Sequence, residues 1–289
     1  MTGLDAIVIA LPAAYGLALI LLFVFQRRLQ YLPDRRPTPV AQSGMTGGED
    51  LRLETSDGET LVAWHFPPER GRPVILYFHG AAGALVDRVP RLRPLVARGY
   101  GLFAVSFRGY AGSTGSPTED GLILDAETAY REAALRYGDD RLVIMGASLG
   151  TAIAVAVAAK REALALVLLA PFLSAMDVAA RRLPMLPVKR LMRDQYRTDL
   201  AISGVCMPVL MIHGARDRIV PITSGERLFA LAREPKRFLN VPHGGHVVLG
   251  SSGVLEELCD WIDRVDARRR VVRRDMNTGM SVSGGDEDP

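Results

Sequence analysis

Cysteine is scarce in this chain of 289 residues, and the two that occur, Cys206 and Cys259, stand in no motif spacing. Their separation argues against both a disulfide-stapled fold and a cysteine zinc site, so we expect two reduced thiols. Histidine is rare too, at five residues, and none of the five belongs to a His-Glu-x-x-His arrangement. The sequence therefore does not predict a zinc-dependent mechanism.

The chain also lacks the motifs and the charge imbalance of proteins that bind nucleotides or nucleic acids. It contains neither a Gly-x-Gly-x-x-Gly pattern nor a phosphate-binding loop with its lysine. Basic residues number 35 and acidic residues 32, which leaves a net charge of only +3. Such a balance gives no strongly basic surface for a phosphate backbone, and we expect no nucleic-acid partner.

Charge is absent from the 20 residues between Ala6 and Phe25, and this gap predicts a membrane anchor. As a helix the segment would be about 30 Å long, which matches the hydrocarbon core of a bilayer. The alternatives are a buried core helix and a cleaved signal peptide, but the segment lacks the basic start and the cleavage site of the latter. Arg27, Arg28, Arg35 and Arg36 follow the segment and no basic residue precedes it. The positive-inside rule then predicts a single-pass protein of the cell membrane with a cytoplasmic catalytic domain.

Six apolar runs beyond residue 70 predict the strands of a parallel sheet. They are continuous rather than alternating, which is typical of strands that helices cover on both faces. Most are separated by helical stretches, and this alternation indicates a doubly wound α/β sheet with ligands at the carboxyl ends of its strands. A polar turn, Ser56–Glu59, predicts a hairpin ahead of them. The predicted parallel strands are 74–78, 102–106, 141–145, 165–169, 208–212 and 237–241.

The chain is expected to contain one α/β domain with an extension at each end. The basic cluster Arg268–Arg274 could lie on anionic lipid, or it could be the solvated end of a helix. From Met276 the tail is polar and ends in acidic residues, so we expect disorder there. The predicted parts are an anchor with its juxtamembrane segment at 1–32, a linker at 33–50, an α/β domain at 51–266 with a small cap at about 171–205, and a basic then disordered tail at 267–289.

Ser148 is the candidate nucleophile, because it lies in Gly146-Ala-Ser-Leu-Gly150 directly after the apolar run Leu142–Met145. A small-residue helical stretch follows at 151–160, so a strand, a tight turn and a helix place the hydroxyl at the tip of the turn. A hydroxyl is a poor nucleophile unless a base reaches it and donors for an oxyanion lie beside it. A sharp strand-to-helix turn gives access to both. The five-residue pattern alone is weak, and its place between a buried strand and a helix strengthens it.

In hydrolases built on such a turn, the acid and the base follow the serine in the order Asp or Glu, then His. Asp217 comes just after the predicted strand 208–212, where its carboxylate can hold an imidazole in the tautomer that faces Ser148. A surface acid paired with a neighbouring arginine is the alternative. His246 follows two glycines at the end of its loop and is the predicted base, while His243 is the competitor. The other histidines are interpreted as structural: His65, His79 and His213.

Two backbone N–H groups are expected to bind the oxyanion. The first belongs to Leu149, the residue after the nucleophile. The second is assigned to Ala81, in the small-residue loop His79–Gly83 that follows strand 74–78, and a plain glycine-rich turn is the alternative. The serine, the acid, the base and this loop all come just after predicted strand ends. Since the carboxyl ends of parallel strands share one edge of a sheet, these assignments predict one common site.

The longest break in the strand and helix alternation, Pro171–Val205, predicts a small cap over that site. Its leucines and methionines have apolar side chains that would suit an acyl chain. Leu173, Met176 and Met185 are the predicted substrate contacts. Packing onto the sheet is the alternative use of such residues.

At these positions the chain resembles the α/β-hydrolases. More narrowly, it resembles a membrane-tethered branch that holds the bud-emergence-suppressor homologues, lysophosphatidylserine lipases and protein-palmitate thioesterases. The resemblance implies an α/β-hydrolase fold and carries the family's triad onto Ser148, Asp217 and His246. Ala81 stands where members commonly have Asn, and Val247 where they have a polar residue. The similar segments are 51–262 as a whole and, more specifically, 25–33, 107–121, 186–190, the loop of Asp217, and 234–238.

These features together predict a membrane-anchored serine hydrolase that cleaves acyl esters or thioesters through an acyl-enzyme. Since a serine, a histidine, a carboxylate and water complete this chemistry, we expect no metal and no organic cofactor. The expected partners are an acyl ester, thioester or lipid-like small molecule and the lipid bilayer. The alternatives are an exopeptidase or amidase with the same triad and a non-catalytic binding protein with this fold. The oligomeric state stays open.

Overall fold

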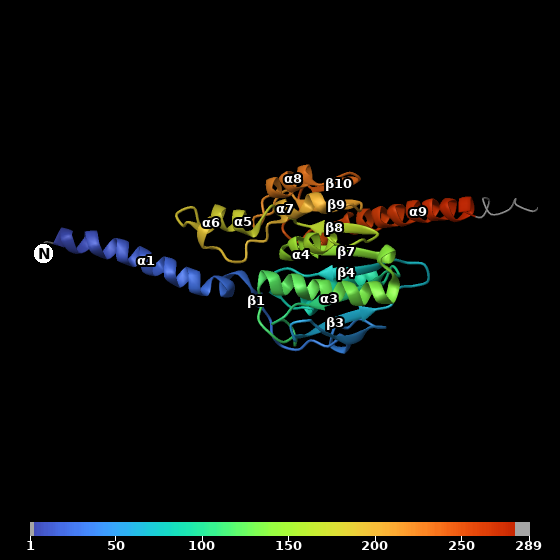
Figure 1. Ribbon diagram of the computed structural model, residues 1–289, viewed down its shortest axis with the longest axis horizontal. Helices are drawn as coiled ribbons and strands as arrows, with labels where there is room; N and C mark the ends of the chain where they lie inside the picture. Colours follow the sequence, from blue (N-terminus) through green and yellow to red (C-terminus); the bar gives the residue numbers. More distant parts are fainter. Residues whose placement is uncertain (1–2, 281–289) are drawn as a thin grey trace, which may run out of the picture.

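An eight-stranded sheet forms the centre of the protein in the computed structural model, which describes residues 3–280 (Figure 1). Its strand order is β10-β9-β8-β7-β4-β6-β3-β2. Strands β4 and β6 to β10 run parallel, and β3 and β2 join one edge antiparallel. The predicted doubly wound, mostly parallel sheet is confirmed. The strands are β2 Glu49–Glu54, β3 Thr60–Phe66, β4 Val74–Phe78, β6 Gly101–Ser106, β7 Leu142–Ala147, β8 Ala165–Leu169, β9 Val209–Gly214 and β10 Lys236–Val241.

Every predicted parallel strand occurs within two residues of its expected bounds. Strand β4, near the middle of the sheet, is buried along its whole length. Its Val74 pairs with Gly101 of β6 on one side and with Leu142 of β7 on the other. A strand with neighbours on both sides and helices on both faces has no solvated side, which explains why its sequence shows no polar alternation.

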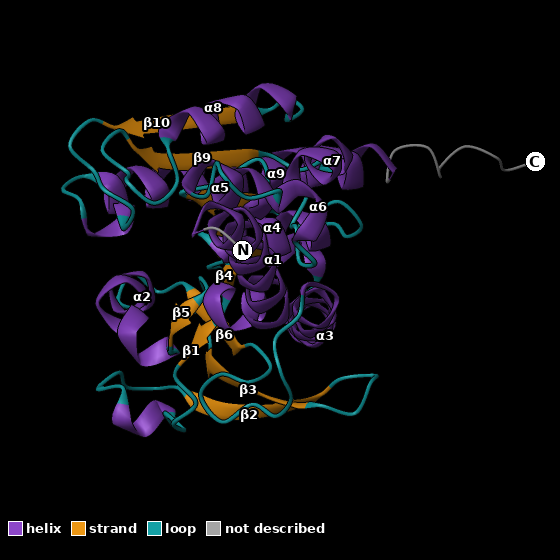
Figure 2. Cartoon of the chain, turned by 90° about the vertical axis from the view of Figure 1, so that its left-hand side faces the viewer, coloured by secondary structure: helices purple, strands orange, loops and turns teal. Residues whose placement is uncertain are grey.

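Helices cover both faces of the sheet, and Figure 2 shows α2 and α3 on opposite sides of the strands. Alternate residues of β4 contribute to two hydrophobic clusters. Leu76 belongs to the cluster that contains residues of α3, α4 and α8, while Ile75 and Tyr77 belong to the cluster with residues of α2 and α9. The covering helices are α2 Val89–Val96, α3 Glu119–Tyr137, α4 Leu149–Ala158, α8 Ile222–Leu231 and α9 Val254–Met280.

Three short helices lie between β8 and β9, in the stretch where the sequence predicts a cap. They are α5 Ala175–Arg182, α6 Val188–Leu191 and α7 Thr198–Ala201. Ser174 caps α5 by accepting the N–H of Asp177 at 3.0 Å. In Figure 1, α5 and α6 extend from the domain on the same side as the N-terminal helix.

That N-terminal helix, α1 Gly3–Gln30, projects away from the sheet (Figure 1). Its part Ile9–Gln30 has a mean hydropathy of 2.1 and is not buried in the protein, and its length and composition suffice to cross a membrane. The helix also contacts the cap through polar groups. Tyr15 Oη donates to the Met185 carbonyl at 2.9 Å, and Arg27 forms an ion pair with Asp194 at 2.7 Å.

The segment 33–50 differs from the predicted linker, because it packs on the domain. Val40 and Met45 are buried in a core cluster. Trp64 Nε1 donates to the Thr38 carbonyl at 3.0 Å. The many prolines, glycines and polar residues of this segment suggest a linker, but its two buried apolar side chains and the hydrogen bond from Trp64 hold it on the domain.

The C-terminal helix also differs from the expectation. The sequence predicts disorder from Met276, whereas α9 continues to Met280. No proline interrupts the stretch, but Asn277, Thr278 and Gly279 are poor helix formers, so intrinsic helix propensity does not explain this extension. The rest of the predicted disordered tail, 281–289, lies outside the described residues.

Candidate active site

Ser148 lies at the turn between β7 and α4 in a backbone conformation that few residues other than glycine adopt. Its φ is 52° and its ψ is −119°. The glycines on either side make the turn possible. A Cβ on Gly146 would lie 2.3 Å from the carbonyl oxygen of Gly150, and a Cβ on Gly150 would lie 2.1 Å from that of Phe78. Side-chain carbons do not approach oxygen so closely, so both positions require glycine.

His246 joins Ser148 to Asp217 in one chain of hydrogen bonds. Its Nε2 lies 2.9 Å from Ser148 Oγ, and its Nδ1 lies 2.7 Å from Asp217 Oδ2. Three strand ends supply the three side chains, because they follow β7, β9 and β10 in turn. The structure thus brings together three predicted residues that are up to 98 positions apart. The competing His243 is exposed and lines neither cavity at Ser148.

Asp217 is held by more groups than His246 alone. Its Oδ1 accepts the N–H groups of Ile219 and Val220 at 2.7 and 2.9 Å. His213, which is buried and does not reach the hydroxyl, lies with Nε2 3.5 Å from Asp217 Oδ2 and 2.9 Å from the Val220 carbonyl. Burial raises the pKa of Asp217, but the hydrogen bonds from His213, His246 and the backbone outweigh it and hold that pKa well below its usual range. The ionised carboxylate accepts from His246 Nδ1–H, which leaves Nε2 as the acceptor that faces the hydroxyl.

Ala81 and Leu149 both line the cavity that contains Ser148. His79 Nδ1 donates to the Gly80 carbonyl at 2.7 Å. In a trans peptide the Ala81 N–H points opposite to that carbonyl, so it points away from the buried histidine. The Leu149 N–H begins α4 and has no partner within the helix. Within residues 3–280 neither N–H donates a hydrogen bond, an arrangement that leaves both available to an oxyanion.

The loop that carries Ala81 is also held by the segment that follows α1. Strand β1, Leu32–Pro33, pairs in parallel with β5, Ala82–Gly83. Leu32 N–H donates to the Ala81 carbonyl at 2.9 Å, and Tyr110 Oη donates to the same carbonyl at 2.7 Å. Two donors from distant parts of the chain therefore fix the orientation of this loop.

His79 is 1% exposed, and its contacts require a neutral ring. Nδ1 donates to Gly80, as described, and Nε2 accepts the N–H of Phe107 at 3.3 Å. Burial lowers the pKa of His79 from 6.5 to about 4. The residue is interpreted as structural from the sequence, and the structure adds that it orients the peptide between Gly80 and Ala81.

Through His79, acidification is expected to destabilise the protein as the pH falls from about 6.5 to about 4. In this window the unfolded chain binds the proton and the folded protein does not, so stability is complete above pH 6.5 and is lost toward pH 4. The full loss should be about 3 kcal/mol. Urea unfolding of wild type and His79→Gln across this range checks the prediction. The variant should show a weaker pH dependence, and equal dependence in the two proteins would contradict it.

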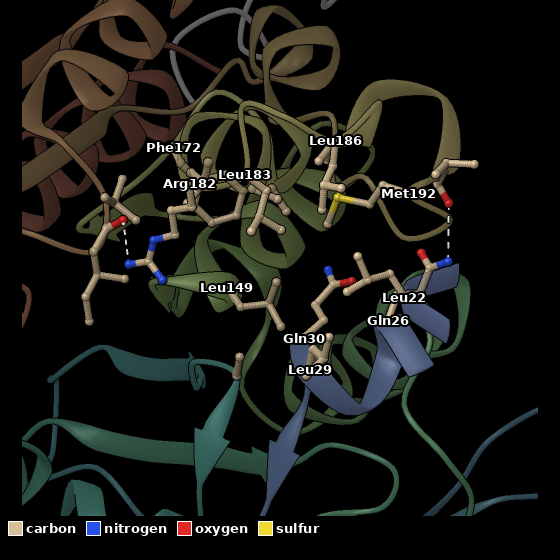
Figure 3. Close-up of a pocket in the computed structure, with 18 of the residues that line it drawn as sticks. Leu22, Gln26, Leu29, Gln30, Leu149, Phe172, Arg182, Leu183, Leu186 and Met192 are labelled. Atoms are coloured by element: carbon tan, nitrogen blue, oxygen red, sulfur yellow. Dashed lines mark hydrogen bonds between the residues drawn. The ribbon is translucent and has the colours of Figure 1, made fainter. Parts of the chain in front are cut away.

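The larger of two cavities at Ser148 has a volume of about 510 Å³ and mostly apolar walls, a size typical of small-molecule sites. Figure 3 shows that side chains of α1, such as Leu22 and Gln26, face side chains of the cap, such as Leu186 and Met192. The cap and the loop after β8 contribute Phe172, Ala175, Val178, Ala179, Arg182, Leu183, Leu186, Val188, Leu191 and Met192.

None of the three predicted substrate contacts lines this cavity. Met176 is on another face of α5 and is only 9% exposed, and Leu173 is buried in the core. Met185 is 83% exposed at the tip of the cap. The sequence selects these side chains by type alone, whereas the helical period turns Met176 away from the cavity, and Leu173 and Met185 lie outside α5. The face of α5 that does so carries Ala175, Val178, Ala179 and Arg182.

A second cavity, of about 270 Å³, adjoins both Ser148 and His246. Arg88 and Arg91 line it, and their guanidinium groups donate to backbone carbonyls of Ala82 and Asp87. Neither arginine forms an ion pair within the part of the chain that the structure describes. The hydroxyl therefore lies between an apolar cavity and a cavity that carries positive charge. Across the described residues, no group of three or more histidine, cysteine or carboxylate side chains could hold a metal ion.

Sequence reasoning missed the contribution of helix α1 to the larger cavity. Six of its residues line the cavity, and we term them the α1 wall. Their spacing places them on one face of the helix. Two glutamines at the end of an otherwise apolar segment could have signalled a contact there. The α1 wall consists of Leu19, Leu22, Phe23, Gln26, Leu29 and Gln30.

Comparison with known proteins relates the chain to one family. A family model described as alpha/beta hydrolase fold matches residues 73–207. The chain is 42% identical to "Uncharacterized protein Rv2307c" of Mycobacterium tuberculosis, over 82% of this chain and 88% of that protein. It is 32% identical to "Alpha/beta hydrolase domain-containing protein WAV2" of Arabidopsis thaliana, over 87% of this chain and 88% of that protein. The solved Pyrococcus furiosus esterase Pf2001 shares the fold, with a TM-score of 0.63 at 19% identity over 82% of this chain and 97% of that one.

Proposed function

Since the chain belongs to the α/β-hydrolase family, we propose that it is a serine hydrolase that cleaves acyl esters or thioesters. Ser148 Oγ attacks the carbonyl carbon while His246 Nε2 accepts the hydroxyl proton, and the carbonyl oxygen becomes an oxyanion. The N–H groups of Leu149 and Ala81 bind this oxyanion. Asp217 holds the imidazole in place and stabilises the charge that forms on it.

Collapse of the tetrahedral intermediate breaks the bond to the leaving group, which takes its proton from His246. The acyl group remains on Ser148 as an ester. A water molecule then gives a proton to the same imidazole and attacks the acyl carbon. A second collapse releases the carboxylic acid and returns the proton to Ser148.

The observation that supports this proposal best is the hydrogen-bonded chain from Ser148 through His246 to Asp217, together with the N–H groups of Ala81 and Leu149, which donate to no acceptor among residues 3–280. A nucleophile, a base that reaches it and a group that orients the base are the parts that acyl transfer needs. The apolar walls of the larger cavity favour a hydrocarbon chain as the acyl part of the substrate.

Labelling with a fluorophosphonate tests the proposed reaction, because this reagent traps an activated serine. The wild-type protein should be labelled and Ser148→Ala should not. Comparable labelling of both proteins would end the proposal. A series of p-nitrophenyl esters of rising chain length then measures how the larger cavity responds to the acyl group.

We further propose that α1 anchors the protein in the cell membrane with the catalytic domain in the cytoplasm, as in the membrane-tethered branch that the sequence resembles. The hydropathy of Ile9–Gln30 supports the anchor, and the arginines that follow it support the orientation. A reporter that functions only in the cytoplasm should be active when it is fused to the C-terminus of the protein. If the only active fusion carries a reporter that functions outside the cytoplasm, the proposed orientation is wrong.

A further inference from the structure

The larger cavity extends from Ser148 along helix α1. Its inner end includes Ser148, Leu149 and Ala81, and its lining follows α1 and the residues after it from Leu32 back to Leu19. The helical part of this lining, Leu19–Gln30, is twelve residues or about 18 Å long, so the cavity is a channel rather than a compact pocket. Figure 3 shows the two sides of this channel, with α1 on one side and the cap on the other.

Polar contacts fasten α1 and the residue that follows it to the cap at separate points along the channel. At the inner end, the hydroxyl groups of Tyr31 and Tyr196 lie 2.7 Å apart and are buried. Farther out, Gln26 Nε2 donates to the Leu191 carbonyl at 3.2 Å, and Tyr15 Oη reaches the cap tip. These contacts hold helix α1 against the cap, so the α1 wall is an integral part of the cavity lining.

The outer end of the channel is surrounded by exposed apolar side chains. The cap tip exposes Leu183 and Met185, beside Tyr15 of the helix. Tyr15 lies twelve residues before Arg27, a distance of about 18 Å along the helix axis. With the arginines at the membrane surface, this tip lies at the depth of lipid acyl chains. The other faces of α1 expose Leu17, Ile20, Leu21 and Val24 at similar depths.

Two basic residues follow the apolar cap tip in the chain, and basic side chains next to an apolar tip suit the headgroup layer of a membrane. Lys189 and Arg190 are exposed on α6, and Lys189 lies 4.0 Å from Asp177 of α5. Their long side chains can reach headgroups while the residues before them stay in the hydrocarbon. The cap thus has the order of apolar and basic residues that suits partial insertion into a bilayer.

We propose that the acyl chain of a membrane lipid ester enters the channel sideways from the bilayer, between α1 and the cap, so that the anchor helix is also one wall of the acyl-binding site. This inference rests on the proposed serine hydrolase function. The acyl chain lies against the α1 wall and its ester carbonyl reaches Ser148. The alcohol part of the lipid leaves through the second cavity, past Arg88 and Arg91.

A tryptophan on the α1 wall tests the acyl-binding role of the helix. Leu22 lines the channel, whereas Leu21, its neighbour, is exposed and lines no described cavity. In the full-length protein, Leu22→Trp should lower the ratio of kcat/KM for p-nitrophenyl palmitate to that for p-nitrophenyl butyrate at least tenfold. The matched control Leu21→Trp should keep this ratio within twofold of wild type. An unchanged ratio in Leu22→Trp, with or without loss of both activities, would overturn the α1 wall as an acyl-binding surface.

Reconstitution into vesicles tests entry from the bilayer. The full-length protein should hydrolyse a long-chain glycerolipid ester in its own vesicles at least tenfold faster than the same ester in separate vesicles. Equal rates would overturn lateral entry. A palmitoylated cysteine peptide in the same vesicles tests the source of the chain, and faster release from the peptide than from the lipid would overturn the lipid ester as the substrate.

These outcomes remain distinguishable from failure of the proposed function. Fluorophosphonate labelling and butyrate ester turnover depend on Ser148 but not on a long chain. If both are present in the wild type and the channel tests fail, the hydrolase proposal stands and the channel proposal falls. If both are absent, the hydrolase proposal falls and the channel proposal falls with it.

Discussion

Ser148→Ala is expected to lower kcat for ester hydrolysis by about 10⁶-fold, because the acyl-enzyme can no longer form. The loss should appear in kcat and not only in KM, since the walls of both cavities remain in place. Residual turnover should come from water activated near the oxyanion donors. Steady-state kinetics with a p-nitrophenyl ester measure the effect, and the unfolding midpoint in urea checks that the variant is folded.

Ser203→Ala provides the matched control for this change. Ser203 is exposed and lines neither cavity, so its hydroxyl can be removed without effect on the site. We expect turnover of this variant within twofold of wild type. A folded Ser148→Ala protein with wild-type kcat would refute the role of Ser148.

Asp217→Asn is expected to lower kcat by about 10⁴-fold. The asparagine fits the site and its oxygen can still accept the N–H groups of Ile219 and Val220. Its amide nitrogen, however, then faces His246 Nδ1 and favours the tautomer with the proton on Nε2. That imidazole cannot accept the Ser148 proton, so the nucleophile is present but not activated. Steady-state kinetics on the same ester, with a proof of folding, measure the loss.

Asp199→Asn is the matched control for charge removal. Asp199 forms a partly exposed ion pair with Arg197 at 2.7 Å and lines no described cavity. Ion pairs open to solvent contribute little to stability, so this variant should keep its turnover and unfold near the wild-type midpoint. A similar loss in both variants would mean that lost negative charge, rather than the tautomer of His246, explains the result.

The sheet was the part of the fold that the sequence predicted best. Strands β4 and β8 have the predicted bounds, because a strand buried on both faces has a continuous apolar sequence that differs from its surroundings. The order of strands along the chain and the shared edge of parallel strands then predicted where Ser148, Asp217 and His246 would meet. These rules depend on chain topology and need no knowledge of side-chain packing.

Contacts between separate elements were not predictable in the same way. The sequence assigns α1 to the bilayer, and its apolar composition does not reveal that one face also lines the larger cavity. The segment 33–50 was interpreted by its average composition, which hides the buried Val40 and Met45. Met176 was selected by its side chain, whereas its place in the helical period points it elsewhere. In each case the docking of one element on another decides the result.

Part of the family resemblance now has a physical explanation. The segment 107–121 contains Tyr110, whose hydroxyl holds the Ala81 carbonyl. It also contains Arg108, which is buried and forms ion pairs with Asp57 and Asp125 at 2.8 and 2.7 Å. Tyr110 thus holds the Ala81 loop, while Arg108 joins the segment to the turn between β2 and β3 and to α3, so the similar sequence marks a structural support rather than the reacting groups.

The pairing of β1 with β5 has a practical consequence for work on a water-soluble form of this enzyme. Deletion of residues 1–33 removes the apolar helix α1. It also removes the N–H of Leu32, which donates to the Ala81 carbonyl. Poor turnover of a short-chain ester by such a shortened protein would reflect the loss of one of the two donors that hold the Ala81 loop, and would say little about the full chain. A protein that begins at Tyr31 keeps that support and is the better starting point for crystals and for assays with short-chain esters, whereas long-chain esters require the α1 wall that both shortened forms lack.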